Sequence, residues 1–204
     1  MRARVWLTQR VEVIADRDER RDALDRRWIA FVDACGAVAV PVPNDAAWVE
    51  TMWAEDPPAA VLLTGGNSLV SCGGDAPERD AVENLLLDLC ARDGVPVLGV
   101  CRGMQVIMAR HGARLVPVTG HVAPRQTIDI AGVPATVNSY HDFGAHEVPA
   151  GLEAWARARD GVIKAVRVPG ASVVGIMWHP ERMDPFRRQD RELLRELLGN
   201  GETT

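Results

Sequence analysis

Residues 96–112 read PVLGVCRGMQVIMARHG, and they place one cysteine between an apolar run and an amphipathic run. The first run is typical of a buried strand of a parallel sheet, and the second has its apolar residues at helical spacing. Cys101 stands at the junction, two residues after Gly99 and two before Gly103. A strand that enters a helix directly needs a tight turn, where glycines tolerate the crowded backbone. The stretch predicts a thiol on that turn, at a helix N-terminus whose dipole favours the thiolate.

Strand-like and helix-like patterns alternate along the first two-thirds of the chain. Apolar runs predict strands over residues 4–9, 37–43, 59–66 and 96–100. Helices are expected from Leu24 to Cys35, from Pro77 to about Gly94, and from Arg102 to His111. Repeated units of this kind predict the α/β class, with a doubly wound, mostly parallel sheet flanked by helices.

The pattern of predicted elements changes in the last third of the chain. Turn residues predict one β-hairpin about Ala131-Gly132 and another about Pro169-Gly170. A final helix is expected from about Asp184 to Leu198. Neither a repeat nor a linker interrupts the pattern, so a single domain over residues 1–204 is expected.

Bulk properties narrow the class of protein. The 204 residues are 47% hydrophobic, the net charge is −5 and the basic residues are dispersed, which argues against nucleic acid as a partner. No apolar run approaches the length of a membrane span, and the opening residues lack the apolar core of a leader, so no membrane partner is expected. The four cysteines show no C-x-x-C spacing, so we expect neither a zinc site nor a disulfide framework, and a reducing, cytoplasmic setting.

A cysteine nucleophile needs a base and a group that orients this base. His179 follows an apolar strand in GIMWHPER, and Glu181 lies two residues further on, across the rigid Pro180. His111 at a helix end is expected to cap a carbonyl, and His146 has no evident partner. Each motif alone also fits a purely structural role. Cys101 could be a buried cysteine of the core, and His179 could be a solvent-exposed histidine at the end of a strand.

Four ordered motifs, LLTGGNS, GVCRGMQ, VNSYH and GIMWHPE, lie between about residues 58 and 183. Together they resemble the class I glutamine amidotransferases of the γ-glutamyl hydrolase type. The resemblance implies a flavodoxin-like fold, with Cys101 as the nucleophile, His179 as its base and acid, and Glu181 as the orienting carboxylate. It further implies hydrolysis of a γ-glutamyl amide through a γ-glutamyl thioester, with glutamate released and no metal or organic cofactor.

The same resemblance implies roles for nine further residues. The backbone N–H groups of Gly66 and Arg102 would form the oxyanion hole. The residues expected to contact the γ-glutamyl substrate are Gly65, Asn67, Gln105, His121, Ser139, Tyr140 and His141. The alternatives are an ordinary glycine turn, a polar helix residue, and a loop in which Asn138 and Ser139 only cap turns.

Two enzyme types remain open: a glutaminase subunit that feeds a separate synthase chain, and a hydrolase that works without one. The sequence CRG, with Arg102 after the cysteine, resembles the hydrolases. It argues against a group of proteins that share the cysteine turn but usually have histidine directly after the cysteine. The opening segment resembles members associated with capsule polysaccharide modification, which remove a γ-glutamyl group from a nucleotide-linked phosphoramidate. Arg10, Arg20 and Arg21 are then candidates for phosphate contacts; the alternative is a first strand and an amphipathic helix with solvated arginines. A binding module without catalytic activity is a further alternative. The chain is also a candidate for a homodimer.

Overall fold

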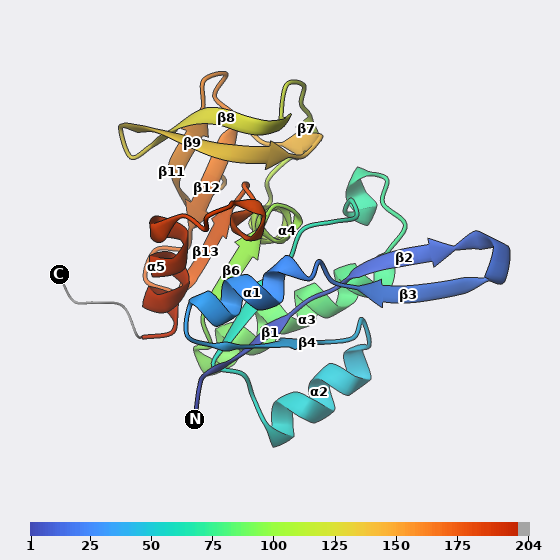
Figure 1. Cartoon of the computed structure of the whole chain (residues 1–204). Helices are drawn as coiled ribbons and strands as arrows, with labels where there is room; N and C mark the ends of the chain where they lie inside the picture. The colour runs from blue at the N-terminus through green and yellow to red at the C-terminus, as the bar shows by residue number, and fades with distance from the viewer. Residues whose placement is uncertain (200–204) are drawn as a thin grey trace.

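A nine-stranded sheet forms the centre of the computed structural model, which describes residues 1–199 (Figure 1). One half of the sheet is parallel and one half antiparallel. The parallel half consists, in spatial order, of β4 (Val38–Pro41), β1 (Arg4–Leu7), β5 (Ala60–Leu63), β6 (Val97–Val100) and β13 (Val173–Ile176). The antiparallel half continues with β12 (Ile163–Arg167), β11 (Glu153–Ala158), β8 (Val122–Ile130) and β9 (Val133–Tyr140).

Helices cover both faces of the parallel half. They are α1 (Arg27–Ala34), α2 (Ala46–Glu55), α3 (Pro77–Asp93), α4 (Arg102–Arg110) and α5 (Arg188–Leu197). On one face α2 and α4 both pack against α3, and on the other α1 lies near α5, where Phe31 meets Phe186 edge to face (Figure 1). This is the predicted α/β architecture of a parallel sheet between helical layers. Every helix within residues 1–199 falls short of the length and hydropathy that a membrane span requires.

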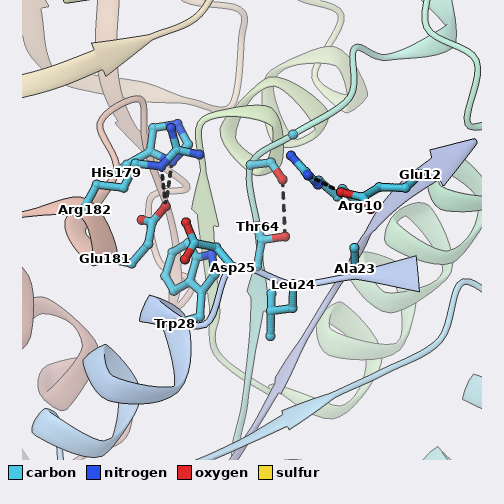
Figure 2. Close-up of a pocket in the computed structure, with 12 residues that line it drawn as sticks. Arg10, Glu12, Ala23, Leu24, Asp25, Trp28, Thr64, His179, Glu181 and Arg182 are labelled. Atoms are coloured by element: carbon cyan, nitrogen blue, oxygen red, sulfur yellow. Dashed lines mark hydrogen bonds and ion pairs between the residues drawn. The ribbon is translucent and has the colours of Figure 1, made fainter. Parts of the chain in front are cut away.

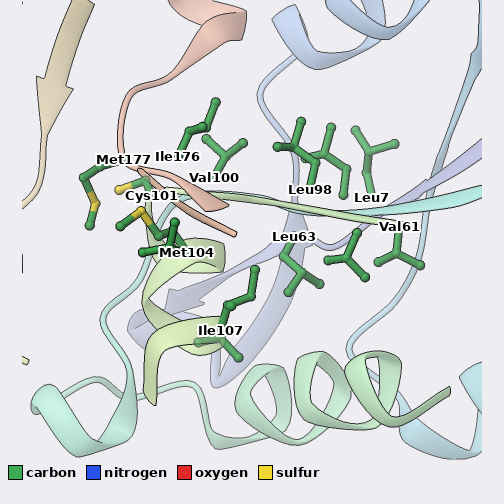
Figure 3. Packing of buried hydrophobic residues seen from close by; sticks show 14 of the residues in the cluster. Leu7, Val61, Leu63, Leu98, Val100, Cys101, Met104, Ile107, Ile176 and Met177 are labelled. Carbon is green, nitrogen blue, oxygen red and sulfur yellow. The ribbon is translucent and has the colours of Figure 1, made fainter. Parts of the chain in front are cut away.

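The core lies where β1, β5 and β6 are covered on both faces. Side chains of these strands, among them Leu7, Leu63 and Leu98, are fully buried (Figure 3). Burying one such side chain stabilises the fold by roughly 1.5–3 kcal/mol. Because β5 and β6 are parallel neighbours, the loops at their carboxyl ends emerge at the same edge of the sheet. The TGG loop and Cys101 are therefore brought together there.

The predicted hairpins of the last third are present. Ala131 and Gly132 both have positive φ, 51° and 85°, which is the conformation of a tight two-residue hairpin turn between β8 and β9. The second hairpin joins β12 to β13 around Gly170. Two short strands, β7 (Val116–Pro117) and β10 (Phe143–Gly144), form a separate antiparallel pair.

The opening segment differs from the amphipathic helix considered above. Strands β2 (Arg10–Ile14) and β3 (Glu19–Ala23) form a hairpin that projects from the body, joined by the 3-10 turn η1 (Ala15–Arg17) (Figure 1). The sequence of β2 alternates polar and apolar residues up to Val13, which is a strand period. The predicted helix does not begin at Leu24 but at Arg27, because Leu24 follows directly on β3.

The last helix also begins later than predicted, at Arg188 and not at Asp184. Pro185 follows Asp184, and a residue before proline is disfavoured in the helical region. Arg187 is still extended, with ψ 138°, so α5 starts after it.

Candidate active site

Cys101 lies on the turn between β6 and α4, with φ 53° and ψ −102°. Positive φ at a residue other than glycine is strained backbone that the surroundings must hold in place. Close packing at the two flanking glycines keeps this backbone in place. A Cβ atom on Gly103 would lie 2.2 Å from the carbonyl oxygen of Leu63, and a Cβ atom on Gly99 would lie 2.7 Å from the backbone of Gly103. The strand and the helix thus meet backbone to backbone beside the thiol, as the two flanking glycines predict.

His179 is fixed through both its backbone and its ring. Its N–H donates to Asn138 Oδ1 at 2.8 Å, and Asn138 Nδ2 donates to its carbonyl oxygen at 2.8 Å. Its ring lies 2.8 Å, Nδ1 to Oε1, from Glu181 in the 3-10 turn η3 (Pro180–Arg182), and both side chains are buried. With Nδ1–H donating to the carboxylate, Nε2 is the nitrogen available for proton transfer. Nε2 is buried and has no hydrogen-bond partner within residues 1–199.

Gly65 brings the thiol and the imidazole together. A Cβ atom on Gly65 would lie 2.5 Å from Cε1 of His179 and 3.4 Å from Cβ of Cys101, so both side chains pack against this glycine. Burial lowers the pKa of His179, but the charge of Cys101, together with the hydrogen bond and charge of Glu181, outweighs burial and raises that pKa to about 9. A protonated imidazole at neutral pH suits a thiolate–imidazolium pair.

A cavity of about 190 Å³ lies beside His179 and Glu181 (Figure 2). Two arginines line it: Arg10 at the start of β2 and Arg182, which Figure 2 shows on opposite sides. The Arg182 guanidinium carbon lies 5.2 Å from the centroid of the Tyr140 ring. Two guanidinium groups facing one cavity can bind an anionic group with charge-assisted hydrogen bonds.

Besides Glu181, two acidic residues line the cavity, Glu12 and Asp25. Glu12 forms an ion pair with Arg10, and Asp25 forms one with Arg27 at 2.9 Å. Both carboxylates therefore already have an arginine partner, which reduces their repulsion of a bound anion.

Three of the predicted substrate residues belong to a buried cluster around Lys164 on β12. Lys164 Nζ lies 3.0 Å from Ser139 Oγ and 2.6 Å from His141 Nε2. The rings of His121 and His141 stack at 4.9 Å, and His121 Nε2 lies 2.9 Å from Asp160. Burial, followed by the Lys164 charge, lowers the pKa of His141 to about 3, and burial lowers the pKa of Lys164 to about 8. His141 is therefore neutral and accepts a hydrogen bond from the ammonium group.

Two other predicted substrate residues, Tyr140 and Gln105, lie on the Cys101 side of the site. The Tyr140 carbonyl oxygen lies 3.8 Å from Cys101 Sγ, so Tyr140 borders the thiol. Gln105 is buried one helical turn after Cys101, and its Nε2 donates to the Phe143 carbonyl oxygen at 2.9 Å.

The side chain of Asn67 is engaged elsewhere. Its Oδ1 accepts from the N–H of Val11 at 2.8 Å, and its Nδ2 donates to the Val11 carbonyl at 3.0 Å. It fastens β2 to the TGG loop, so its side-chain amide is occupied and only its backbone remains for a substrate.

The arginines proposed for phosphate contacts separate into two groups. Arg10 lines the cavity, whereas Arg20 and Arg21 do not. Arg20 Nε donates to Glu78 at 2.7 Å, and Arg21 Nε donates to Glu19 at 2.7 Å, further along the projecting hairpin. The pairing of β2 with β3 carries these two side chains away from the site.

Sequence reasoning did not identify Arg182, Asn138 or Lys164 as site residues. A signal existed for Lys164, because it interrupts the apolar strand VIKAV, and a charged side chain there must be paired. Arg182 directly follows the histidine–glutamate motif. Asn138 stands in VNSYH, whose residues 139–141 are expected to contact substrate, whereas Asn138 itself is considered only in the turn-capping alternative.

The other cysteines differ from Cys101 in their surroundings. Burial raises the pKa of Cys35 to about 11 and that of Cys90 to about 12, and it also raises the pKa of Cys72. Within residues 1–199 no group of three or more His, Cys, Asp or Glu side chains is arranged to hold a metal ion.

Comparison with known families decides the classification. Residues 29–198 match the model of the family described as glutamine amidotransferase class-I. The chain belongs to this family. The expected resemblance and the expected fold are thereby confirmed.

Three known proteins illustrate the range of this family. A γ-glutamyl-CDP-amidate hydrolase of Campylobacter jejuni is 30% identical over 125 residues, 60% of this chain and 62% of that protein. Anthranilate synthase component 2 of Mycobacterium tuberculosis is 33% identical over 134 residues, 60% of this chain and 58% of the relative. The chain thus spans less than two-thirds of either curated relative. A solved structure of a GMP synthase subunit from Thermoplasma acidophilum superposes with a TM-score of 0.71 at 17% identity, covering 98% of this chain and 94% of that chain, and shares the fold.

Proposed function

We propose that this amidotransferase-family protein is a hydrolase that cleaves a γ-glutamyl C–N bond through a thioester on Cys101. One observation carries the proposal: Cys101 stands at the helix N-terminus beside His179, whose other ring nitrogen is bound to Glu181 at 2.8 Å. Nucleophile, base and orienting acid are the three roles that an activated cysteine requires.

The chemistry follows from these positions. The Cys101 thiolate attacks the γ-carbonyl carbon and forms a C–S bond, while the oxyanion accepts hydrogen bonds from the N–H groups of Gly66 and Arg102. As the C–N bond breaks, His179 gives its Nε2 proton to the departing nitrogen. Neutral His179 then takes a proton from water, whose oxygen attacks the thioester. The C–S bond breaks, glutamate leaves, and the thiolate–imidazolium pair is restored.

We further propose that the leaving group carries a phosphate, as in γ-glutamyl-CDP-amidate, the compound after which the Campylobacter relative is named. The proposed role of this chain is then in capsule phosphoramidate biosynthesis. The support is the cavity on the His179 side, lined by Arg10 and Arg182. A hydrogen bond between a guanidinium and a phosphate is worth roughly 1.5–3 kcal/mol, about one to two factors of ten in affinity. Contacts remote from the reacting carbon can orient the scissile bond.

Glutamate release from a panel of γ-glutamyl compounds tests both parts. The panel holds glutamine, γ-glutamyl-p-nitroanilide, a γ-glutamyl alkylamine and γ-glutamyl-CDP-amidate. We expect the phosphoramidate to have the highest kcat/KM, and Cys101→Ala to abolish release while the matched variant Cys72→Ala retains it. Retained turnover in Cys101→Ala would refute the nucleophile assignment.

The second candidate is a glutaminase subunit that delivers ammonia to a separate synthase chain. The similarity to anthranilate synthase component 2 favours it. This candidate requires glutamine to be the best compound of the panel, with a turnover that rises when a synthase partner is added. The hydrolase proposal requires full turnover by this chain alone.

A further inference from the structure

Arg79, on the first turn of α3, is completely buried behind the loop that follows β5. A guanidinium has five N–H donors in a fixed planar fork. Every one of its nitrogens has at least one acceptor, and five of the contacts lie between 2.7 and 3.2 Å. The acceptors include Thr64 O, Gly65 O, Gly66 O, Asn67 Oδ1 and Glu83 Oε1. One side chain thus binds three consecutive carbonyl oxygens of a single loop.

These bonds determine where the loop directs its N–H groups. A trans peptide unit is planar, and its C=O and N–H point in opposite directions. Since the carbonyl of Gly65 points at Arg79, the N–H of Gly66 points away from it. The opposite side of the loop is the site, because a Cβ atom on Gly65 would meet the side chains of His179 and Cys101. We propose that Arg79 is the positioning residue of the oxyanion hole, holding the Gly66 N–H toward the γ-carbonyl oxygen. This inference rests on the proposed function.

The second half of the oxyanion hole is tied to the same network. Glu83 accepts from Arg79 Nε at 2.9 Å and from Thr8 Oγ1 at 2.8 Å, and its other oxygen accepts from the Arg102 side chain. Arg102 also forms an ion pair with Asp80. Arg102 carries the other N–H of the hole on its backbone, so Glu83 connects the two donors through their supports. The Arg102 side chain is therefore turned into this network and away from the substrate cavity.

Charge reinforces the geometry. The guanidinium faces the carbonyl ends of three peptide dipoles, so the positive N–H ends of these dipoles point away from it. Burial lowers the pKa of Arg79 to about 10, with the Glu83 charge opposing the shift, so Arg79 remains a cation at neutral pH. Lysine does not replace this group, because an ammonium is a point charge with three donors and no fork.

The test compares two reactions of Cys101 in the full chain. Hydrolysis of γ-glutamyl-p-nitroanilide passes through a tetrahedral oxyanion, whereas alkylation by iodoacetamide does not. In Arg79→Lys we expect kcat to fall on the order of 10²-fold, the size of one lost oxyanion donor. KM and the rate of alkylation should stay within about threefold of wild type, because the thiol and His179 are untouched.

The matched control is Arg110→Lys. Arg110 on α4 binds the Asn84 carbonyl at 3.0 Å and pairs with Asp88, so it also bridges α3 and α4, away from the loop. Both rates should be unchanged in this variant. If circular dichroism shows that Arg79→Lys is unfolded, the same two rates are measured in Glu83→Gln. There too, we expect kcat for hydrolysis to fall and the rate of alkylation to stay near that of wild type.

Each outcome decides. Wild-type kcat in Arg79→Lys refutes the inference, and so does a parallel loss of hydrolysis and alkylation, which indicates general damage to the site. Failure of the wild-type protein to hydrolyse any γ-glutamyl compound refutes the proposed function instead.

Discussion

Replacing Gly65 by alanine tests whether Cys101 and His179 act as a pair. The new Cβ would lie 2.5 Å from Cε1 of His179, whereas carbon atoms in van der Waals contact are about 3.5–4.0 Å apart. A Cβ is fixed to its backbone, so the imidazole has to yield by about 1 Å. The φ of Gly65 lies outside the left-handed region, so alanine adds no backbone strain. The perturbation acts on the imidazole above all.

The expected magnitude follows from that displacement. A misplacement of about 1 Å at a reacting group costs on the order of 10²-fold in rate, which corresponds to about 2.7 kcal/mol of barrier. We expect this loss in kcat for γ-glutamyl-p-nitroanilide. The interactions of Cys101 and Glu181 raise the pKa of His179 to about 9. A displaced imidazole should lose part of these interactions, so the alkaline limb of the pH–rate profile is expected to move to lower pH.

Steady-state kinetics and thermal unfolding of the same preparations provide the assay. The control is Gly36→Ala, just after α1, where φ is +85° and no atom lies within 4 Å of the new Cβ. Backbone strain there costs about 1–2 kcal/mol of stability, so a lower Tm with unchanged kcat is expected. A Gly65→Ala protein with kcat within threefold of wild type would refute the placement of His179 as the working base.

Two further variants test the electrostatics of the site. Glu181→Gln removes the carboxylate that helps raise the pKa of His179 to about 9, so the alkaline limb of kcat/KM should move to lower pH, and an unmoved limb would contradict the pairing. The same raised pKa stabilises the folded state fully below about pH 6.5 and loses this effect as pH rises through 9, so the variant's loss of Tm should be larger at pH 6 than at pH 9.5. Lys164→Met removes a charge next to His141, whose pKa of about 3 should rise while burial keeps it below the ordinary value. An NMR titration of the ring checks this, and an unchanged pKa would contradict it.

Local sequence signals predicted the parallel half of the fold well, because there the signal and the structure coincide. Apolar runs of four to five residues mark β5 and β6, and Gly94 with φ 69° ends α3 where a helix stop was expected. The hairpin of β2 and β3 could not be predicted in this way, since β3 reads ERRDA and contains a single, small apolar residue. Its strand conformation comes from pairing with β2, a contact that hydrophobic periodicity does not encode.

The candidate site shows the same division. Cys101, His179 and Glu181 could be named from local motifs, because Cys101 follows directly on β6 and the other two lie within five residues of the end of β13. Arg79 could not, because an arginine on a charged helix is usually solvated. Its burial depends on three carbonyls from a loop more than ten residues away, and that geometry exists only after α3 has packed against β5.

The buried cations of the site are best understood as one unit with the thiol. Burial lowers the pKa of Arg79 to about 10 and that of Lys164 to about 8, and the charge of Cys101 opposes the shift in both cases. Both cations therefore lie within electrostatic range of Cys101. His179 then supplies a third positive charge, and its buried Nε2 has no hydrogen-bond partner among residues 1–199. In the proposed function these groups have different tasks: Arg79 and Lys164 keep fixed positive charge near the thiol, and His179 transfers the proton.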